Sequence, residues 1–114
     1  MLKHKPVDGQ GVKFYYEVDG QEVGRAYLYL LHNDLHKQPC GFLEDVFVSE
    51  AFRGRGIAQT LLKAVIEEAR RRECYKMVAT SREERTKVHS FYERLGFRNY
   101  GFEFRMDFPT LSST

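Results

Sequence analysis

The first half of the chain has the hydrophobic pattern of β-strands. Val12 to Val18 and Glu22 to Leu31 are rich in β-branched and aromatic residues, as strands usually are. Asp19-Gly20 lies between these segments and is typical of a two-residue hairpin turn. A loop containing Pro39 follows, and Phe42 to Val48 is predicted as the third strand. We therefore expect an antiparallel hairpin followed by one more strand.

The second half changes to the spacing of helices. Apolar side chains recur three and four residues apart between Gly56 and Arg72, which predicts an amphipathic helix. A short strand is expected at Lys76–Thr80. Ser81 and Glu84 have the spacing of a capping box and should begin a second helix, which ends at Gly96. The apolar face of that helix would consist of Val88, Phe91, Tyr92 and Leu95.

The last predicted element is a strand from Phe102 to Phe108, where apolar and charged residues alternate. The expected order is β-β-β-α-β-α-β, which predicts a mixed α/β sheet. The strand-helix-strand unit from Phe42 to Thr80 should form a right-handed parallel crossover. We find no linker that would divide residues 1–114, so we expect one domain with a loose tail at residues 109–114.

Composition excludes several classes of protein. The 18 basic and 16 acidic residues give a net charge of +2, which argues against a nucleic-acid partner. The longest apolar run, Ala26 to Leu31, is far shorter than the roughly 20 residues of a membrane helix. Two cysteines, Cys40 and Cys74, make neither a disulfide framework nor a four-cysteine zinc site. We expect a soluble, cytoplasmic protein with reduced thiols and no bound metal.

The segment Arg53-Gly54-Arg55-Gly56 lies between a predicted strand and a predicted helix. A helix start exposes backbone N–H groups, and glycines let a ligand approach them, so this segment suits a phosphate group. It is no P-loop, because the Gly-Lys pair is missing, and Gln59 replaces the third glycine of the dinucleotide fingerprint. The alternative is a turn that needs two glycines beside solvent-exposed arginines.

Two motifs resemble those of the GCN5-related N-acetyltransferase family. The stretch Val46 to Ala58 is similar to the family's acyl-CoA motif, and Phe91-Tyr92-Glu93-Arg94-Leu95-Gly96-Phe97 is similar to its Phe-Tyr-x-x-x-Gly-Phe box. The resemblance covers about Gly41 to Phe108 and implies an acetyl-CoA-dependent N-acetyltransferase without a metal. It also implies that two splayed central parallel strands, ending near Val48 and Thr80, admit the cofactor.

The resemblance implies a set of cofactor contacts. The backbone of Val46, Phe47 and Val48 would pair with the pantetheine arm, and one of these N–H groups would polarise the thioester carbonyl. Arg85 stands where many members have asparagine, and its side chain would reach the coenzyme phosphates. The backbone N–H groups expected to hold the pyrophosphate belong to Arg53, Gly54, Arg55, Gly56, Ile57, Ala58 and Gln59.

Tyr92 and Glu44 are the candidate catalytic residues. The resemblance implies that Tyr92 protonates the departing thiolate, which suits a phenol of pKa about 10; the alternative is a core tyrosine. Glu44 lies among apolar residues and is the candidate base for the amine, and its surroundings also resemble the diamine-acetylating branch. The alternative is a surface carboxylate in an ion pair. Strand alternation places Asp45 on the opposite face, in a structural role.

Other residues that suit chemistry are discounted. His32 and His36 flank Asp34, but a solvated loop is favoured over a metal site. Cys74 follows three arginines that could lower its pKa, and an ordinary reduced thiol is favoured.

The front of the chain departs from the family pattern. The family usually has a strand and two helices that wall the acceptor site, and 11 residues precede Val12 here. We therefore expect an open acceptor site or one completed by a partner subunit, and we favour a homodimer. The leading hypothesis is acetyl transfer to a primary amine, on a small molecule or a protein, by direct attack in a ternary complex. The alternative is a non-catalytic acetyl-CoA-binding module.

Overall fold

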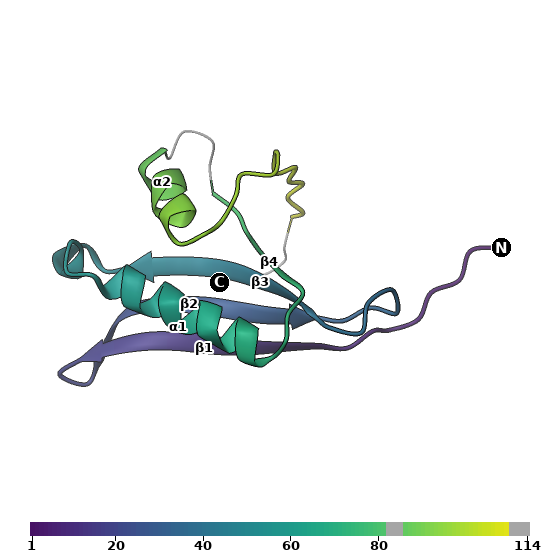
Figure 1. The fold of residues 1–114 in the computed structure, drawn as a ribbon, viewed down its shortest axis with the longest axis horizontal. Helices are drawn as coiled ribbons and strands as arrows, with labels where there is room; N and C mark the ends of the chain where they lie inside the picture. Colours follow the sequence, from purple (N-terminus) through teal and green to yellow (C-terminus); the bar gives the residue numbers. More distant parts are fainter. Residues whose placement is uncertain (82–85, 110–114) are drawn as a thin grey trace. The chain divides into compact units, whose positions relative to one another are not determined.

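The computed structural model describes residues 1–81 and 86–109, and these residues fall into two compact units that divide between Thr80 and Ser81. The first unit contains a four-stranded sheet with the strand order β1-β2-β3-β4 (Figure 1). Neighbouring strands are antiparallel from β1 to β3, whereas β3 and β4 run parallel, as the crossover predicts. The strands are β1 (Gly9–Val18), β2 (Gln21–Leu31), β3 (Cys40–Val48) and β4 (Lys76–Ala79).

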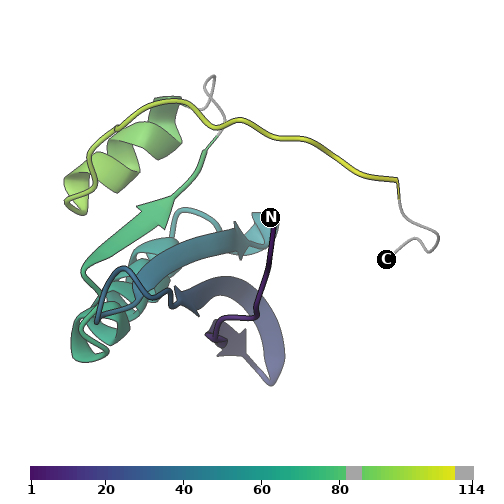
Figure 2. The same cartoon turned by 90° about the vertical axis from the view of Figure 1, so that its right-hand side faces the viewer.

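Helix α1 (Ile57–Arg71) covers one face of this sheet (Figure 2). A short 3-10 turn, η1 (Glu50–Phe52), leads from β3 toward it. Gly24 of β2 lets the helix approach closely, because a Cβ there would lie 3.0 Å from Ile57 Cγ2. Burial of apolar side chains between sheet and helix is the main stabilisation of this unit. The buried side chains are Val23, Ala26, Leu28, Leu30, Leu43, Ile57, Leu61, Leu62, Val65 and Ala69.

A β-bulge interrupts the pairing of β2 with β3. Arg25 pairs with Phe47 and Tyr27 pairs with Glu44, so β3 carries one more residue than β2 in this interval. Asp45 takes up the extra residue with a φ of +52°. The pairing of β3 with β4 ends at Leu43 and Ala79, and β3 continues to Val48 beyond its last partner on β4. This agrees with the expected separation of the two parallel strands.

The second unit contains helix α2 (Thr86–Arg94), which ends in a Schellman motif. The N–H of Phe97 donates to the carbonyl of Tyr92 over 3.1 Å, and the N–H of Gly96 donates to that of Glu93 over 3.0 Å. Gly96 has the left-handed φ of +105° that this ending requires. The ring centroids of Tyr92 and Phe97 are 5.4 Å apart. The Phe-Tyr-x-x-x-Gly-Phe box is thus the end of a helix, as predicted for Gly96.

The predicted strand at Phe102–Phe108 is wrong for this structure. No helix or strand includes any of residues 97–109, all of which the structure describes, and the side chain of Phe104 is 93% exposed. Alternation shows that a segment has one apolar face, but a strand also needs a neighbour that supplies hydrogen bonds. The mixed α/β architecture and the order of the first six predicted elements are confirmed. Glu84 and residues 110–114 of the predicted tail lie outside the described residues.

Candidate functional site

The loop before α1 contains two glycines in the left-handed conformation, which fits both the predicted phosphate cradle and the alternative of a plain turn. Gly54 and Gly56 have φ values of +78° and +80°, which glycine adopts without strain. A Cβ at either position would meet nothing within 4 Å, so backbone conformation selects glycine here, not lack of space. Gly56 is the N-cap of α1, and no side chain caps the helix. The first turn therefore leaves backbone N–H groups at the positive end of the helix dipole.

Two arginines, Arg53 and Arg55, belong to the loop that leads into this helix. The Nε of Arg53 donates a hydrogen bond to the carbonyl of Val48 over 2.8 Å, and its guanidinium lies 5.6 Å from the Phe47 ring centroid. Arg25 lies 4.8 Å from the same centroid, on the neighbouring strand. Arg55 lies over Phe52, at 5.0 Å. Among the described residues, Arg53 and Arg55 form no ion pair with a carboxylate, so these two side chains keep their positive charge beside the loop.

The predicted cofactor strand and the predicted phosphate loop come together in the structure. Val46, Phe47 and Val48 form the end of β3, beyond the last β4 pair. The hydrogen bond from Arg53 to Val48 joins this strand end to the loop. Ile57, Ala58 and Gln59 make up the first turn of α1, as expected for residues that offer N–H groups.

Glu44 lies on the sheet face opposite α1. Its Cα partner is Tyr27, and the adjoining pair, Leu28 and Leu43, is buried on the helix side. Glu44 is half-buried. Asp45 was expected on the other face, and this is wrong: the bulge breaks the alternation, and Asp45 lines the same hollow as Tyr27.

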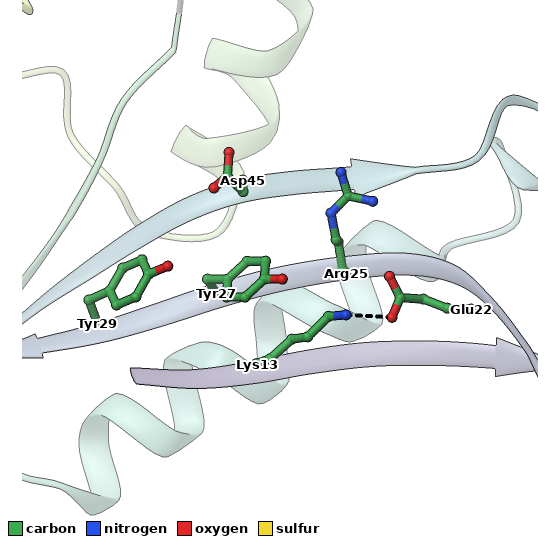
Figure 3. A pocket seen from close by; sticks show the side chains of 6 residues that line it. All are labelled: Lys13, Glu22, Arg25, Tyr27, Tyr29 and Asp45. Atoms are coloured by element: carbon green, nitrogen blue, oxygen red, sulfur yellow. Dashed lines mark hydrogen bonds and ion pairs between the residues drawn. The ribbon is translucent and has the colours of Figure 1, made fainter. Parts of the chain in front are cut away.

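That hollow has a volume of about 570 Å³ and belongs to the sheet of the first unit (Figure 3). Lys13 and Glu22 form an ion pair of 2.6 Å in it. The hydrogen bond that Lys13 donates to the Glu22 carboxylate raises the pKa of Lys13 above its usual value. No sequence motif marks this hollow, although polar and aromatic positions alternate with buried ones along β2 and are the signal that could indicate it. The lining residues are Lys13, Glu22, Arg25, Tyr27, Tyr29 and Asp45.

Tyr92 belongs to α2 of the second unit, where it is half-buried. Its ring lies 6.1 Å from that of Phe91, in addition to its contact with Phe97. This agrees with a tyrosine on the apolar stripe of the helix and leaves its catalytic role a prediction. Arg85, the predicted phosphate ligand, lies outside the described residues.

The discounted residues have ordinary surroundings. The ring of His36 stacks on Tyr75 at 4.2 Å. Burial raises the pKa of the Cys74 thiol, with a contribution from nearby Cys40. In the part of the chain that the structure describes, we find no group of three or more His, Cys, Asp or Glu residues that could hold a metal ion. No helix among the described residues is long and apolar enough to cross a membrane.

Comparison with protein families gives a match to the acetyltransferase (GNAT) family over residues 4–97. The chain belongs to this family. It is 34% identical over 95 residues to a glucosamine 6-phosphate N-acetyltransferase of Trypanosoma brucei brucei. This alignment covers 82% of this chain and 63% of the relative. It is 33% identical over 100 residues to an aminoglycoside N(6')-acetyltransferase type 1 of Stenotrophomonas maltophilia. This alignment covers 84% of this chain and 65% of the relative.

A solved GNAT structure is also similar. AAC(6')-Iy in complex with the bisubstrate analog CoA-S-monomethyl-acetylneamine superposes with a TM-score of 0.72 and 26% identity, over 88% of this chain and 70% of that one. This chain spans less than two thirds of the length of the two curated relatives, at 63% and 65%.

Proposed function

We propose that this chain transfers an acetyl group from acetyl-CoA to an amine. The observation that carries the proposal is the Arg53–Val48 contact, which places the uncapped start of α1 beside the free end of β3. A pyrophosphate suits the N–H groups of residues 53–59, and an extended pantetheine arm suits a strand end with an open side. Membership of the GNAT family supports the same cofactor. In the proposed complex, the backbone of Val46, Phe47 and Val48 pairs with the pantetheine.

The proposed chemistry is direct attack in a ternary complex. The amine nitrogen bonds to the acetyl carbon, the carbon–sulfur bond breaks, and the thiolate leaves as coenzyme A. An N–H group of the β3 end polarises the carbonyl oxygen. Glu44 accepts the proton of the amine, directly or through water, and Tyr92 donates a proton to the thiolate. A phenol of pKa about 10 suits a thiolate whose conjugate acid has a pKa of about 8.5.

The proposed acceptor is an amino sugar. The two curated relatives are named for glucosamine 6-phosphate and for aminoglycosides, both of which carry amines on sugar rings. We also propose that the protein acts as a homodimer in the cytoplasm, where thiols such as Cys40 and Cys74 stay reduced. The exposed apolar side chains of Phe102, Phe104, Met106 and Phe108 support a partner surface.

Two measurements test the function. The first is a calorimetric titration with acetyl-CoA, with NAD and ATP as controls. We expect selective micromolar binding, about −8 kcal/mol. The second follows thiol release from acetyl-CoA with a panel of amino sugars and diamines. Binding with turnover of an amine supports the proposal. Binding without turnover of any amine favours the non-catalytic acetyl-CoA-binding module, and a folded protein without acetyl-CoA binding contradicts both.

A further inference from the structure

The hollow on the sheet face opposite α1 is open and polar, and it is large enough to hold a small molecule. Its volume of about 570 Å³ lies within the roughly 300–1,000 Å³ of known ligand pockets. Its residues come from β1, β2 and β3, so rigid strands position them. The proposed base Glu44 lies on this sheet face, and none of the residues that line the hollow belongs to the two motifs or to the proposed cofactor contacts.

Four charged side chains line the hollow, and two of them neutralise each other while the other two have no charged partner among the described residues. Lys13 and Glu22 neutralise each other at 2.6 Å. Arg25 and Asp45 form no hydrogen bond or ion pair with any residue that the structure describes. The guanidinium of Arg25 is instead held 4.8 Å from the ring centroid of Phe47, which leaves its N–H groups available. A ligand therefore meets one available cation and one available anion.

Two aromatic rings, those of Tyr27 and Tyr29, follow Arg25 along β2 and form one wall of the hollow. The rings of Tyr27 and Tyr29 are inclined by 9° with centroids 6.1 Å apart. The faces of aromatic rings are electron-rich and attract ammonium groups and the C–H groups of a saturated ring. Figure 3 shows both rings on β2, with Arg25 at the end nearer Tyr27.

Asp45 places the hollow next to the proposed reaction centre. It directly precedes Val46, the first residue proposed to bind the pantetheine arm and the thioester. We infer that the hollow is the acceptor subsite and that it selects a ring-sized amine with an anionic group. Asp45 binds the ammonium, the Tyr27 and Tyr29 rings contact the sugar ring, and Arg25 binds the phosphate or carboxylate. This inference rests on the proposed function.

The charge balance distinguishes this ligand class from a polycation. A polycationic acceptor would need several carboxylates that are not neutralised by other residues. The Glu22 carboxylate is already paired with Lys13, so only Asp45 is available among the residues that line the hollow. A zwitterionic amine matches the open Arg25 and Asp45 charges one for one. Such a site discriminates against other amines mainly because their binding would leave the charge of Arg25 or Asp45 without a partner, which costs free energy.

Glucosamine 6-phosphate and glucosamine form the test pair, because they differ only in the phosphate. We expect kcat/KM about tenfold or more higher for the phosphorylated sugar, since one charged hydrogen bond distinguishes them. Arg25→Met should abolish this preference and leave the Kd of acetyl-CoA unchanged. Asp45→Asn should lower kcat/KM for both sugars. Arg70→Met removes a charge from the far end of α1 and serves as the matched control.

A second readout does not need turnover. Calorimetry with the protein saturated with CoA should detect glucosamine 6-phosphate, and binding should weaken about tenfold in Arg25→Met. Equal rates for both sugars, or a preference that survives Arg25→Met, overturns the inference while acetyl transfer stands. Binding that depends on Arg25 without acetylation of any amine overturns the proposed function, and the hollow is then a ligand site but no acceptor subsite. If Arg25→Met does not fold, the wild-type preference and Asp45→Asn decide.

Discussion

The Nε atom of Arg53 donates a hydrogen bond to the carbonyl oxygen of Val48 over 2.8 Å. This contact spans the 3-10 turn at Glu50–Phe52 and joins the end of β3 to the loop before α1. One side chain therefore links the two cofactor-binding segments of the proposal. The same guanidinium lies over Phe47, so its position is fixed on two sides.

Replacing Arg53 should weaken the cofactor more than the fold. The side chain is exposed, and a single hydrogen bond contributes about 1 kcal/mol to stability. Arg53→Met should raise the Kd of acetyl-CoA by about tenfold, because it removes both the charge near the pyrophosphate and the bond that orients the loop. Calorimetry at two salt concentrations measures this. Arg70→Met is the control, because it removes a charge at the other end of α1. A Kd of Arg53→Met equal to that of wild type would show that Arg53 does not contribute to acetyl-CoA binding.

Gly56→Ala should destabilise the protein through backbone conformation alone. The φ of +80° costs an L-residue about 1–2 kcal/mol, and the added methyl group meets nothing within 4 Å. Urea denaturation should show a loss of about 1 kcal/mol. Gly101→Ala is the matched control, because that position has no left-handed φ and also meets nothing within 4 Å. Equal stability of the two variants would contradict the requirement for a left-handed N-cap.

Tyr92→Phe tests the proposed acid. Phenylalanine keeps the ring contacts with Phe91 and Phe97, so the free energy of unfolding should change little. If the phenol protonates the thiolate, kcat should fall about a hundredfold with an unchanged Kd for acetyl-CoA. Tyr100→Phe serves as control, since Tyr100 is 87% exposed. Turnover equal to wild type would remove Tyr92 as the acid.

Glu44→Gln tests the proposed base. The amide keeps the size of the side chain and its place beside Tyr27 in the register, but it cannot accept a proton at neutral pH. The pH–rate profile should lose its acidic limb, and kcat should fall about a hundredfold or more. Glu17→Gln, on the exposed edge strand, is the control. A profile with the same shape as wild type would mean that another group accepts the proton.

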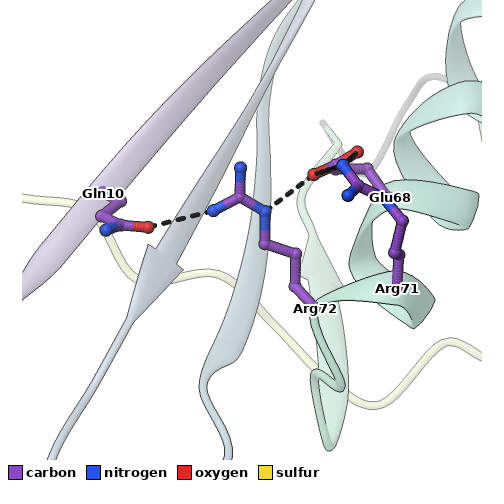
Figure 4. A network of polar contacts seen from close by, with 4 residues as sticks. All are labelled: Gln10, Glu68, Arg71 and Arg72. Carbon is purple, nitrogen blue, oxygen red and sulfur yellow. Dashed lines mark hydrogen bonds and ion pairs between the residues drawn. The ribbon is translucent and has the colours of Figure 1, made fainter.

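The end of α1 should respond to acid through Glu68. Arg71 and Arg72 donate hydrogen bonds to its carboxylate, and Arg72 also reaches Gln10 of β1 at 3.0 Å (Figure 4). The bond from Arg71, with that from Arg72, lowers the pKa of Glu68 below 4.5. The stabilisation is present above pH 4.5 and disappears as the pH falls below this value. The urea midpoints of wild type and Glu68→Gln should therefore differ at pH 7, and the difference should shrink as the pH falls below 4.5. Equal midpoints at pH 7 would show that the pair adds no stability.

Local rules predicted most elements because their signals are local. The Asp19-Gly20 turn and the apolar spacing along α1 each act over a few residues. The strand at Phe102–Phe108 failed for the opposite reason, because alternation cannot report whether a neighbouring strand is present. Asp45 failed because a single extra residue in β3 reverses every side chain that follows.

The sequence by itself determined the mixed α/β order, the glycines and arginines before α1, and the Gly96 helix ending. These depend on propensity and on backbone conformations that few residues adopt. Only the tertiary structure decided that β3 outlasts its pairing with β4 and that Arg53 ties its end to the loop. It also decided that Arg25, Tyr27 and Asp45 line one hollow. Register and bulges arise from pairing between distant segments, and no local spacing encodes them.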